Sequence, residues 1–233
     1  MIKFLHTNDF HGFLPSVYPK LLQIRDQFDL YLDSGDAVKF GNLAIPVGTD
    51  PAWEHLDNLK CDASVLGNRE VHYTKRLLKA KLAGLQHPIL CANMVARDGS
   101  RPFANEIIFC RKGVRVGVFG VMIEMTSARK KFSGLSEFLW ENPIAAARGC
   151  VGRLKDHADL IVGLTHIGFG TDKVIADKVP GIDIILGGHS HEALLEPILV
   201  NGCFIAQAGS HGRFAGAYEW DGSRLSGGLI SLK

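Results

Sequence analysis

The most constraining feature of this sequence is a series of short apolar segments separated by amphipathic stretches. The expected strands are 2–6, 30–33, 63–66, 89–92, 160–165 and 182–186, and the expected helices are 19–28, 50–60, 71–82, 143–157 and 171–179. Strands that are apolar on both faces and that alternate with helices are typical of an α/β layered fold. We therefore expect parallel strands covered by helices.

Two regions depart from this alternation. Residues 107–111 and 114–121 flank Lys112-Gly113 and predict a hairpin, and the chain after Pro197 predicts short strands joined by Gly-rich turns, at 198–200, 204–207, 215–221 and 225–232. Hairpins within a parallel pattern predict two packed sheets flanked by helices. No linker interrupts the 233 residues, so we expect one domain spanning residues 1–233.

Composition excludes several classes of protein. Hydrophobic residues make up 46% of the chain and charged residues 21%, which is ordinary for globular proteins and excludes intrinsic disorder. No run approaches about 18 uninterrupted apolar residues, so we expect no transmembrane helix and no membrane partner. A net charge of +2 is too small to predict a nucleic-acid partner.

The cysteines predict free thiols rather than disulfides or a thiolate metal site. They are five in number and widely spaced, without a Cys-x-x-Cys pair: Cys61, Cys91, Cys110, Cys150 and Cys203. Their apolar neighbours predict buried, reduced side chains. The N-terminal residues lead directly into polar sequence and do not resemble a signal peptide. A cytoplasmic location is therefore expected.

Metal-type ligands follow five of the expected strands. Ligand sites in α/β sheets lie outside the carboxyl ends of the strands, so these side chains are expected to meet at one edge. The candidates are Asp9, His11, Asp36, Asn68, His166, His189 and His191. Each segment alone is more typical of an ordinary surface or core residue, whereas all five together are hard to assign to chance.

The number and spacing of these ligands favour two metal ions. Residues two apart in an extended segment point to the same side, so Asp9 with His11, and His189 with His191, are expected to face one pocket as pairs. Seven nitrogen and oxygen ligands exceed the coordination of one tetrahedral zinc and suit two divalent cations about 3.5–4 Å apart. The mixed donors favour Mn, Fe, Zn, Co or Ni.

The motifs around these ligands resemble those of a known family. They are His6-Thr-Asn-Asp9-Phe-His11-Gly12, Asp33-Ser-Gly-Asp36, Gly67-Asn68-Arg69-Glu70, Thr165-His166 and Gly188-His189-Ser190-His191. In this order they resemble the calcineurin-like metallophosphoesterases, and within them the 5′-nucleotidase branch. Ala208-Gly209-Ser210 is similar to that branch's A-G-S turn, and the resemblance covers essentially the whole chain.

The resemblance implies a four-layer αββα sandwich of two mixed sheets flanked by helices, with a dinuclear metal centre. It places Asp9, His11, Asp36 and His191 on the first ion and Asp36, Asn68, His166 and His189 on the second, with Asp36 bridging. The implied activity is hydrolysis of a phosphomonoester or small phosphodiester, such as a nucleotide, by a hydroxide that bridges the metals. A metal-dependent hydrolase of another bond is a weaker alternative.

One departure from the family affects the chemistry. The family motif G-N-H-E has His where this sequence has Arg69, and the Asp that orients that His is replaced by His72. Arginine cannot donate a proton, because its pKa exceeds about 12, but it can hold phosphate oxygens. We therefore expect Asn68 and Arg69 to contact the substrate, with His72 or solvent protonating the leaving group. Alternatively, His72 is only a first-turn residue of a solvated helix.

That departure supports a second hypothesis, a catalytically weakened family member that binds a phosphorylated ligand or a partner. A further departure concerns the substrate. The longer 5′-nucleotidases have a C-terminal domain whose aromatic side chains sandwich the nucleobase, and this sequence is expected to end where that domain would begin. Trp53, Trp140 and Trp220 are expected to pack in the core. The basic cluster 129–131 could attract anions but is more typical of a solvated loop.

Overall fold

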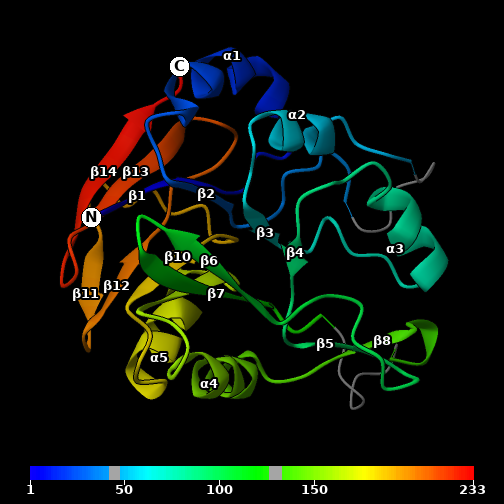
Figure 1. The fold of residues 1–233 in the computed structure, drawn as a ribbon. Helices are drawn as coiled ribbons and strands as arrows, with labels where there is room; N and C mark the ends of the chain where they lie inside the picture. The colour runs from blue at the N-terminus through cyan, green and yellow to red at the C-terminus, as the bar shows by residue number, and fades with distance from the viewer. Residues whose placement is uncertain (42–47, 126–132) are drawn as a thin grey trace.

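Two six-stranded sheets lie face to face in the computed structural model, which describes residues 1–41, 48–125 and 133–233 (Figure 1). The first sheet contains, in chain order, β1 (Ile2–Thr7), β2 (Leu30–Asp33), β3 (Ala63–Val65), β4 (Ile89–Leu90), β13 (Phe214–Trp220) and β14 (Leu225–Ser231). The second contains β6 (Glu106–Arg111), β7 (Val114–Met122), β9 (Leu160–His166), β10 (Ile184–Gly187), β11 (Ile198–Val200) and β12 (Cys203–Ala206).

Both sheets are mixed, as the hairpins in the sequence predict. The first has the order β14-β13-β1-β2-β3-β4, in which β1 to β4 are parallel. Strand β13 pairs antiparallel with β1, and β14 pairs antiparallel with β13. The second has the order β11-β12-β10-β9-β7-β6, with antiparallel strands at both edges. The strands that carry the predicted ligands, β1, β2, β3, β9 and β10, therefore all lie inside their sheets, whereas the parallel strand β4 forms one edge of the first sheet.

Helices cover the two outer faces of the sheets. They are α1 (Leu14–Arg25), α2 (Ala52–Asn58), α3 (Lys75–Lys81), α4 (Pro143–Leu154) and α5 (Phe169–Lys178). In Figure 1, α1 and α2 lie above the first sheet, and α4 and α5 lie below the second. The predicted αββα layering is therefore confirmed.

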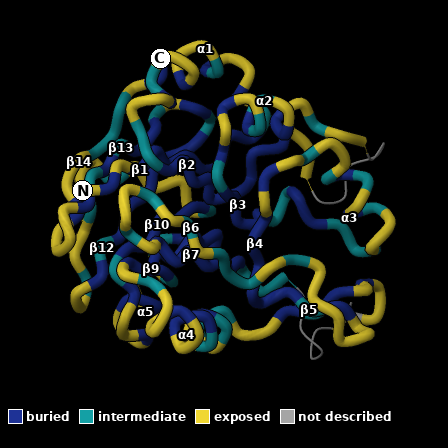
Figure 2. The backbone as a smooth tube through the Cα atoms, in the orientation of Figure 1, coloured by how far each residue is buried: buried dark blue, intermediate teal, exposed yellow. Residues whose placement is uncertain are grey.

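Side-chain alternation along the strands produces three apolar layers. In β1, Phe4 packs between the two sheets, whereas Leu5 packs toward the helices of the first sheet. In β9, Val162 packs between the sheets and Ile161 packs toward the helices of the second. Because successive side chains point to opposite faces, strands that are apolar on both faces fill two layers at once. Figure 2 shows the buried strands enclosed by more exposed helices.

Some element boundaries differ from the sequence expectations. Helix α1 begins at Leu14 and carries Pro19 in its interior, so Pro19 does not mark its start. Helix α3 begins at Lys75 rather than at residue 71, because Thr74 caps it by accepting a hydrogen bond from Leu77 N (3.3 Å). A small antiparallel sheet of β5 (Met94–Ala96) and β8 (Phe138–Trp140), and a 3₁₀ turn at Ser133–Leu135, were not expected.

Several other expectations can be compared with the described residues. None of their helices is long and apolar enough to cross a membrane. All five cysteines are free; Cys110 is exposed, contrary to expectation, and the other four are buried. The three tryptophans are buried, as expected. The basic cluster 129–131 lies outside the described residues.

Candidate metal centre

Five loops meet at the carboxyl ends of parallel strands and bring the predicted ligands together. The loops follow β1, β2 and β3 in the first sheet and β9 and β10 in the second. Asp9 N donates to Gly35 O and His11 N donates to Asp36 O, both at 2.9 Å. Across the two sheets, His189 N donates to Asp9 Oδ2 at 2.8 Å. The ligand loops are therefore held in place by each other's main chain.

The first group of ligands consists of Asp9, His11 and His191, whose ligand atoms lie within 4.8 Å of one another. Asp9 Oδ1 is 3.5 Å from His11 Nε2 and 3.4 Å from His191 Nε2. The two Nε2 atoms are 2.8 Å apart. The His191 side chain is 40% exposed, so this group is open to solvent on one side.

The second group consists of Asp9, Asp36 and His166, again with ligand atoms within 4.8 Å. His166 Nε2 lies 3.5 Å from Asp36 Oδ1 and 3.1 Å from Asn68 Oδ1. The same amide oxygen is 3.0 Å from His189 Nδ1. All seven predicted ligands thus form one continuous cluster, while their division between two metal ions stays a prediction.

The backbone of these loops is not extended, contrary to the reasoning from the spacing. Positive φ angles occur at Asp9 (52°), His11 (50°), Asp36 (56°), His189 (78°) and His191 (61°). Residues other than glycine rarely adopt this left-handed conformation, which turns the chain sharply. Asp9 and His11 still face a common group, but His189 turns toward Asn68 and His191 toward Asp9.

The residues present fit divalent metal ions. Asp9 Oδ1 and His11 Nδ1 are buried and have no hydrogen-bond partner within the described part of the chain. Buried polar atoms in proteins almost always have partners, and a cation bound in the cluster would supply one for both. Imidazole nitrogens with carboxylate and amide oxygens are donors that Mn, Fe, Zn, Co and Ni accept.

The charges within the cluster are strongly coupled. Burial opposes ionisation of Asp36, but the hydrogen bond and charge of His166 hold the pKa of Asp36 below its usual value. Burial also disfavours the charged form of His166, yet Asp36 and Asp9 raise the pKa of His166 to about 9. Burial and the Arg69 charge lower the pKa of His11 to about 4. A cation that binds His166 must therefore displace a proton at neutral pH.

The buried Glu70 carboxylate joins two of the ligand loops through hydrogen bonds to their backbones. It accepts hydrogen bonds from the backbone N–H groups of Asp36 (2.9 Å), Val38 (3.2 Å) and Gly67 (2.9 Å). A Cβ at Gly67 would lie 2.3 Å from Asp36 N and 2.4 Å from Glu70 Oε2, so only glycine fits there. Glu70 therefore fixes the loop after β2 against the loop after β3.

The structure separates Arg69 and His72. Arg69 N donates to Asp36 Oδ1 (2.7 Å), and its guanidinium lies 3.7 Å from Asp36 Oδ2 and donates to Lys39 O (2.9 Å). His72 precedes helix α3 and accepts a hydrogen bond from Tyr73 N (2.8 Å). Within the described residues, no polar or ring contact joins His72 to the ligand cluster. Arg69 thus lies at the cluster, and His72 is not a first-turn helix residue.

His211 is a member of the cluster to which the sequence assigned no role. Its ring centroid lies 4.9 Å from that of His11 and 5.6 Å from that of His191, and its N donates to Asp9 O at 2.8 Å. The Phe13 ring packs edge-on against it at 5.2 Å. The only sequence signal was its position directly after the A-G-S turn.

Comparison with known proteins gives consistent results. A family model described as calcineurin-like phosphoesterase matches residues 2–193. The chain is 25% identical over 233 residues to an uncharacterized metallophosphoesterase, YunD, of Bacillus subtilis, covering 94% of this chain and 49% of that protein. It is 31% identical over 223 residues to the 5′-nucleotidase of Mus musculus, covering 82% of this chain and 38% of that protein. The chain thus spans about half or less of the length of these curated relatives.

Solved structures share the fold. The calcineurin-like phosphoesterase YfkN from Bacillus subtilis has a TM-score of 0.82 at 21% identity, covering 99% of this chain and 90% of that one. The NAD nucleotidase of Haemophilus influenzae has a TM-score of 0.80 at 20% identity, covering 99% of this chain and 49% of that one.

Proposed function

Because this chain belongs to the calcineurin-like phosphoesterase family, we propose that it is a metal-dependent hydrolase of a phosphomonoester or small phosphodiester, such as a nucleotide. The observation that carries the proposal is the continuous cluster of seven nitrogen and oxygen ligands, in which Asp9 Oδ1 and His11 Nδ1 are buried without partners among the described residues. The 5′-nucleotidase relatives support a nucleotide as substrate.

The proposed ligand sets differ from the two geometric groups in the residue that they share, which is Asp36 in the sets and Asp9 in the groups. Asp9, His11, Asp36 and His191 would hold one divalent ion, and Asp36, Asn68, His166 and His189 a second. Bound ions would supply a nucleophilic hydroxide near neutral pH and would neutralise charge on the phosphoryl oxygens. The partly exposed His191 marks the side from which a small phosphorylated substrate reaches the cluster.

Arg69 is the proposed phosphate-binding side chain. The Arg69 side chain is 34% exposed and its guanidinium lies beside Asp36, so it can reach a phosphoryl oxygen without leaving the cluster. A guanidinium stabilises negative charge through two parallel N–H donors but does not release a proton. Water, rather than Arg69, would therefore protonate the leaving group, which favours substrates with acidic leaving groups. His72 stays the other proposed proton donor, although its side chain contacts Tyr73 instead.

Metal content and hydrolysis test the proposal together. We expect elemental analysis of the untreated protein to find close to two equivalents of transition metal, and the Mn²⁺-loaded protein to hydrolyse p-nitrophenyl phosphate or its bis ester. Asp36→Asn should lose most of the bound metal and most of the hydrolytic activity, because the Asp36 carboxylate faces both His11 and His166. Asp98→Asn, at an exposed carboxylate paired with Lys75, is the matched control. Absence of hydrolysis in every case, with no effect of Asp36→Asn on metal content, would contradict the proposal.

The second candidate function is that of a weakened enzyme that binds a phosphorylated ligand or partner, and Arg69 favours it. Arg69 occupies the family's His position and is held by Asp36 and Lys39 O. Arg69→His separates the two candidates, because general acid catalysis contributes about 10²–10⁴-fold. A gain of that order in turnover would favour the weakened enzyme. A loss of turnover would show that Arg69 serves an active one.

Two wider assignments belong to the same proposal. We propose that residues 1–233 act as a single catalytic domain. We also propose that the chain works in a reducing compartment such as the cytoplasm, because Cys61, Cys91, Cys150 and Cys203 are buried free thiols. Determining the thiol content of the protein in cell extracts would test this second assignment.

A further inference from the structure

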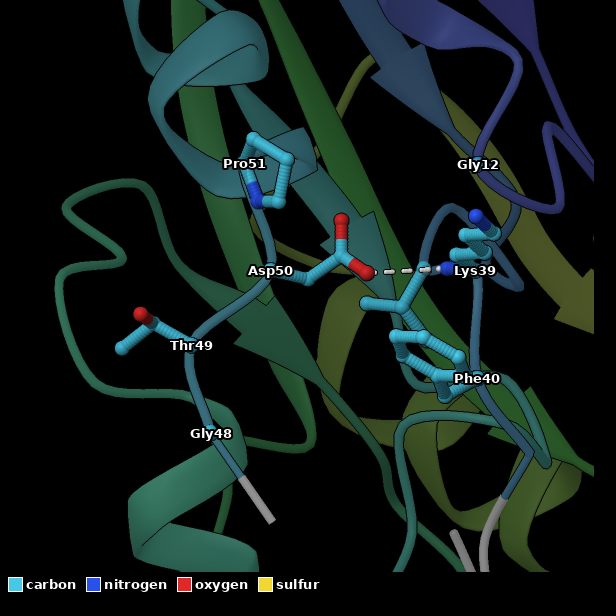
Figure 3. A pocket seen from close by; sticks show the side chains of 8 residues that line it. Gly12, Lys39, Phe40, Gly48, Thr49, Asp50 and Pro51 are labelled. Atoms are coloured by element: carbon cyan, nitrogen blue, oxygen red, sulfur yellow. Dashed lines mark hydrogen bonds between the residues drawn. The ribbon is translucent and has the colours of Figure 1, made fainter. Parts of the chain in front are cut away.

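A cavity of about 280 Å³ lies beside the metal centre. It is lined by residues of two loops, the one after β1 and the one between β2 and α2, among them Gly12, Lys39, Phe40, Asp50 and Pro51 (Figure 3). Gly12 follows the ligand His11 directly, and Lys39 and Phe40 belong to the loop that follows the ligand Asp36. The cavity and the ligand cluster are therefore built from the same two loops.

Arg69 links the cavity to the cluster. Its guanidinium lies 3.7 Å from Asp36 Oδ2 and donates to Lys39 O at 2.9 Å. Gly12 N donates to Ala37 O at 3.0 Å, and a Cβ at Gly12 would lie 2.6 Å from Lys39 Cβ. A phosphoryl group held by Arg69 would therefore have its ester group within reach of the cavity.

Asp50 holds part of the cavity wall in place through two hydrogen bonds. Asp50 accepts hydrogen bonds from Lys39 N (2.9 Å) through Oδ2 and from Ala52 N (3.0 Å) through Oδ1, as the dashed line to Lys39 in Figure 3 indicates for the first. Asp50 thus ties the loop after β2 to the start of α2. The part of the wall fixed in this way does not have to become ordered when a ligand binds.

Phe40 gives the cavity its chemical character. The residue is 59% exposed, whereas Trp53, Trp140 and Trp220 are at most 8% exposed and pack in the core. The Lys39 ammonium lies 5.6 Å from the centre of the Phe40 ring. An exposed aromatic face beside a cationic hydrogen-bond donor suits a planar, carbonyl- or nitrogen-bearing ring, and aliphatic groups gain little from either.

We propose that this cavity is the subsite for the leaving group, and that it takes the nucleobase of a nucleoside monophosphate by stacking on Phe40. The inference rests on the proposed phosphoesterase function and adds the class of substrate. Lys39 donates a hydrogen bond to the base, and Arg69 holds the phosphate at the cluster. The domain thereby recognises a nucleotide with its own residues.

The test compares two phosphomonoesters that differ only in the base. KM is measured for AMP and for ribose 5-phosphate with the Mn²⁺-loaded protein and with Phe40→Ala. The ratio of the two KM values should shift about tenfold against AMP, which corresponds to about 1.4 kcal/mol. Phe40→Tyr should restore the wild-type ratio. Leu199→Ala, on β11 at the same 59% exposure, is the matched control. A ratio that Phe40→Ala leaves unchanged overturns the proposal.

A second measurement does not depend on hydrolysis. Saturation-transfer NMR with adenosine should show transfer to the base protons from the wild-type protein and a severalfold weaker signal from Phe40→Ala. Equal transfer from both proteins overturns the subsite. If AMP and ribose 5-phosphate, p-nitrophenyl phosphate and its bis ester are all left intact, the phosphoesterase assignment fails, and the adenosine measurement alone decides whether the cavity binds a base.

Discussion

At the scale of single residues, the candidate centre depends on backbone conformations that residues other than glycine seldom adopt. Five of the seven proposed ligands have positive φ angles. Such residues cost roughly 1–3 kcal/mol each and persist only where the surroundings enforce them. Here the hydrogen bonds from Asp9 N, His11 N and His189 N supply that enforcement. The strain therefore lies at the residues that would bind metal.

Gly188→Ala tests how closely the ligand loops must approach one another. A Cβ at Gly188 would lie 2.8 Å from Ser34 O, 3.0 Å from Asp9 Oδ2 and 3.2 Å from His166 Nδ1. We expect the variant to push the loop after β10 away from the cluster and to retain less than half of the wild-type metal, as measured by elemental analysis.

Gly170→Ala is the control for this experiment. Gly170 lies in α5, and a Cβ there meets no atom within 4 Å. Because alanine favours a helix over glycine by roughly 0.5–1 kcal/mol, this variant should keep its metal and unfold at a slightly higher temperature. Equal metal content in both alanine variants would contradict the close approach of the loops.

At the scale of elements, a buried polar network connects α5 to the loop that carries His189 and His191. Asp172 accepts hydrogen bonds from Thr165 Oγ1 (2.7 Å) and Gln207 Nε2 (2.8 Å), and Gln207 Oε1 accepts one from Ser190 Oγ (3.0 Å). The network thus joins β9, the residue directly after β12 and the ligand loop after β10. Burial raises the pKa of Asp172 to about 7.

This raised pKa predicts how stability depends on pH. The folded protein binds the Asp172 proton more tightly than the unfolded chain, whose carboxyl has a pKa of 3.8. Its stabilising contribution is therefore complete below about pH 4 and is lost as the pH rises through about 7. Between pH 4 and 8, the free energy of unfolding of the wild type should fall by roughly 2–4 kcal/mol relative to that of Asp172→Asn.

Urea denaturation in the presence of a chelator measures this difference. Asp33 and Glu70, whose pKa values are also raised by burial, titrate in both proteins and cancel in the comparison. Asp177→Asn, on the exposed side of the same helix, should follow the wild-type curve. Parallel pH profiles for the wild type and Asp172→Asn would contradict a buried carboxyl that takes up a proton on folding.

Elements with strong periodicity could be predicted from the sequence, and their exact ends could not. Every strand expected from an apolar run is present, because such runs can be buried only inside the sheets. Helix α3 is shorter than expected because Thr74 caps it, and α1 is longer because Pro19 is accommodated within it. Strands β5 and β8 are only three residues each and pair over a long separation, which leaves no local signal.

At the scale of the whole molecule, the clustering of the seven candidate ligands could be predicted because topology alone brings them together. The carboxyl ends of parallel strands from both sheets meet at one edge, so a polar residue after each strand must lie there. His211 and Phe40 carried no such signal. Each depends on how a loop turns after a motif, and their exposure or ring contacts appear only in three dimensions.

The same topology predicts that metal binding stabilises the packing of the two sheets. Asp9 and Asp36 follow strands of the first sheet, whereas His166 ends β9 and the His189–His191 loop follows β10 in the second. A cation bound between them acts as a link that the unfolded chain lacks. A ligand present at about 100 times its Kd adds about 2.7 kcal/mol to the free energy of unfolding. For a chain of this length, that corresponds to a rise in Tm of roughly 5–10 °C.

Thermal unfolding with and without a chelator tests this link. The Tm of the wild type should fall by roughly 5–10 °C when its metal is removed and should return to its original value on adding Mn²⁺. Asp36→Asn should show a much smaller difference, because it lacks the carboxylate that faces both His11 and His166. Asp98→Asn should behave as the wild type. If the chelator left the Tm of the wild type unchanged while elemental analysis showed that metal had been removed, the cluster would not join the two sheets through a bound ion.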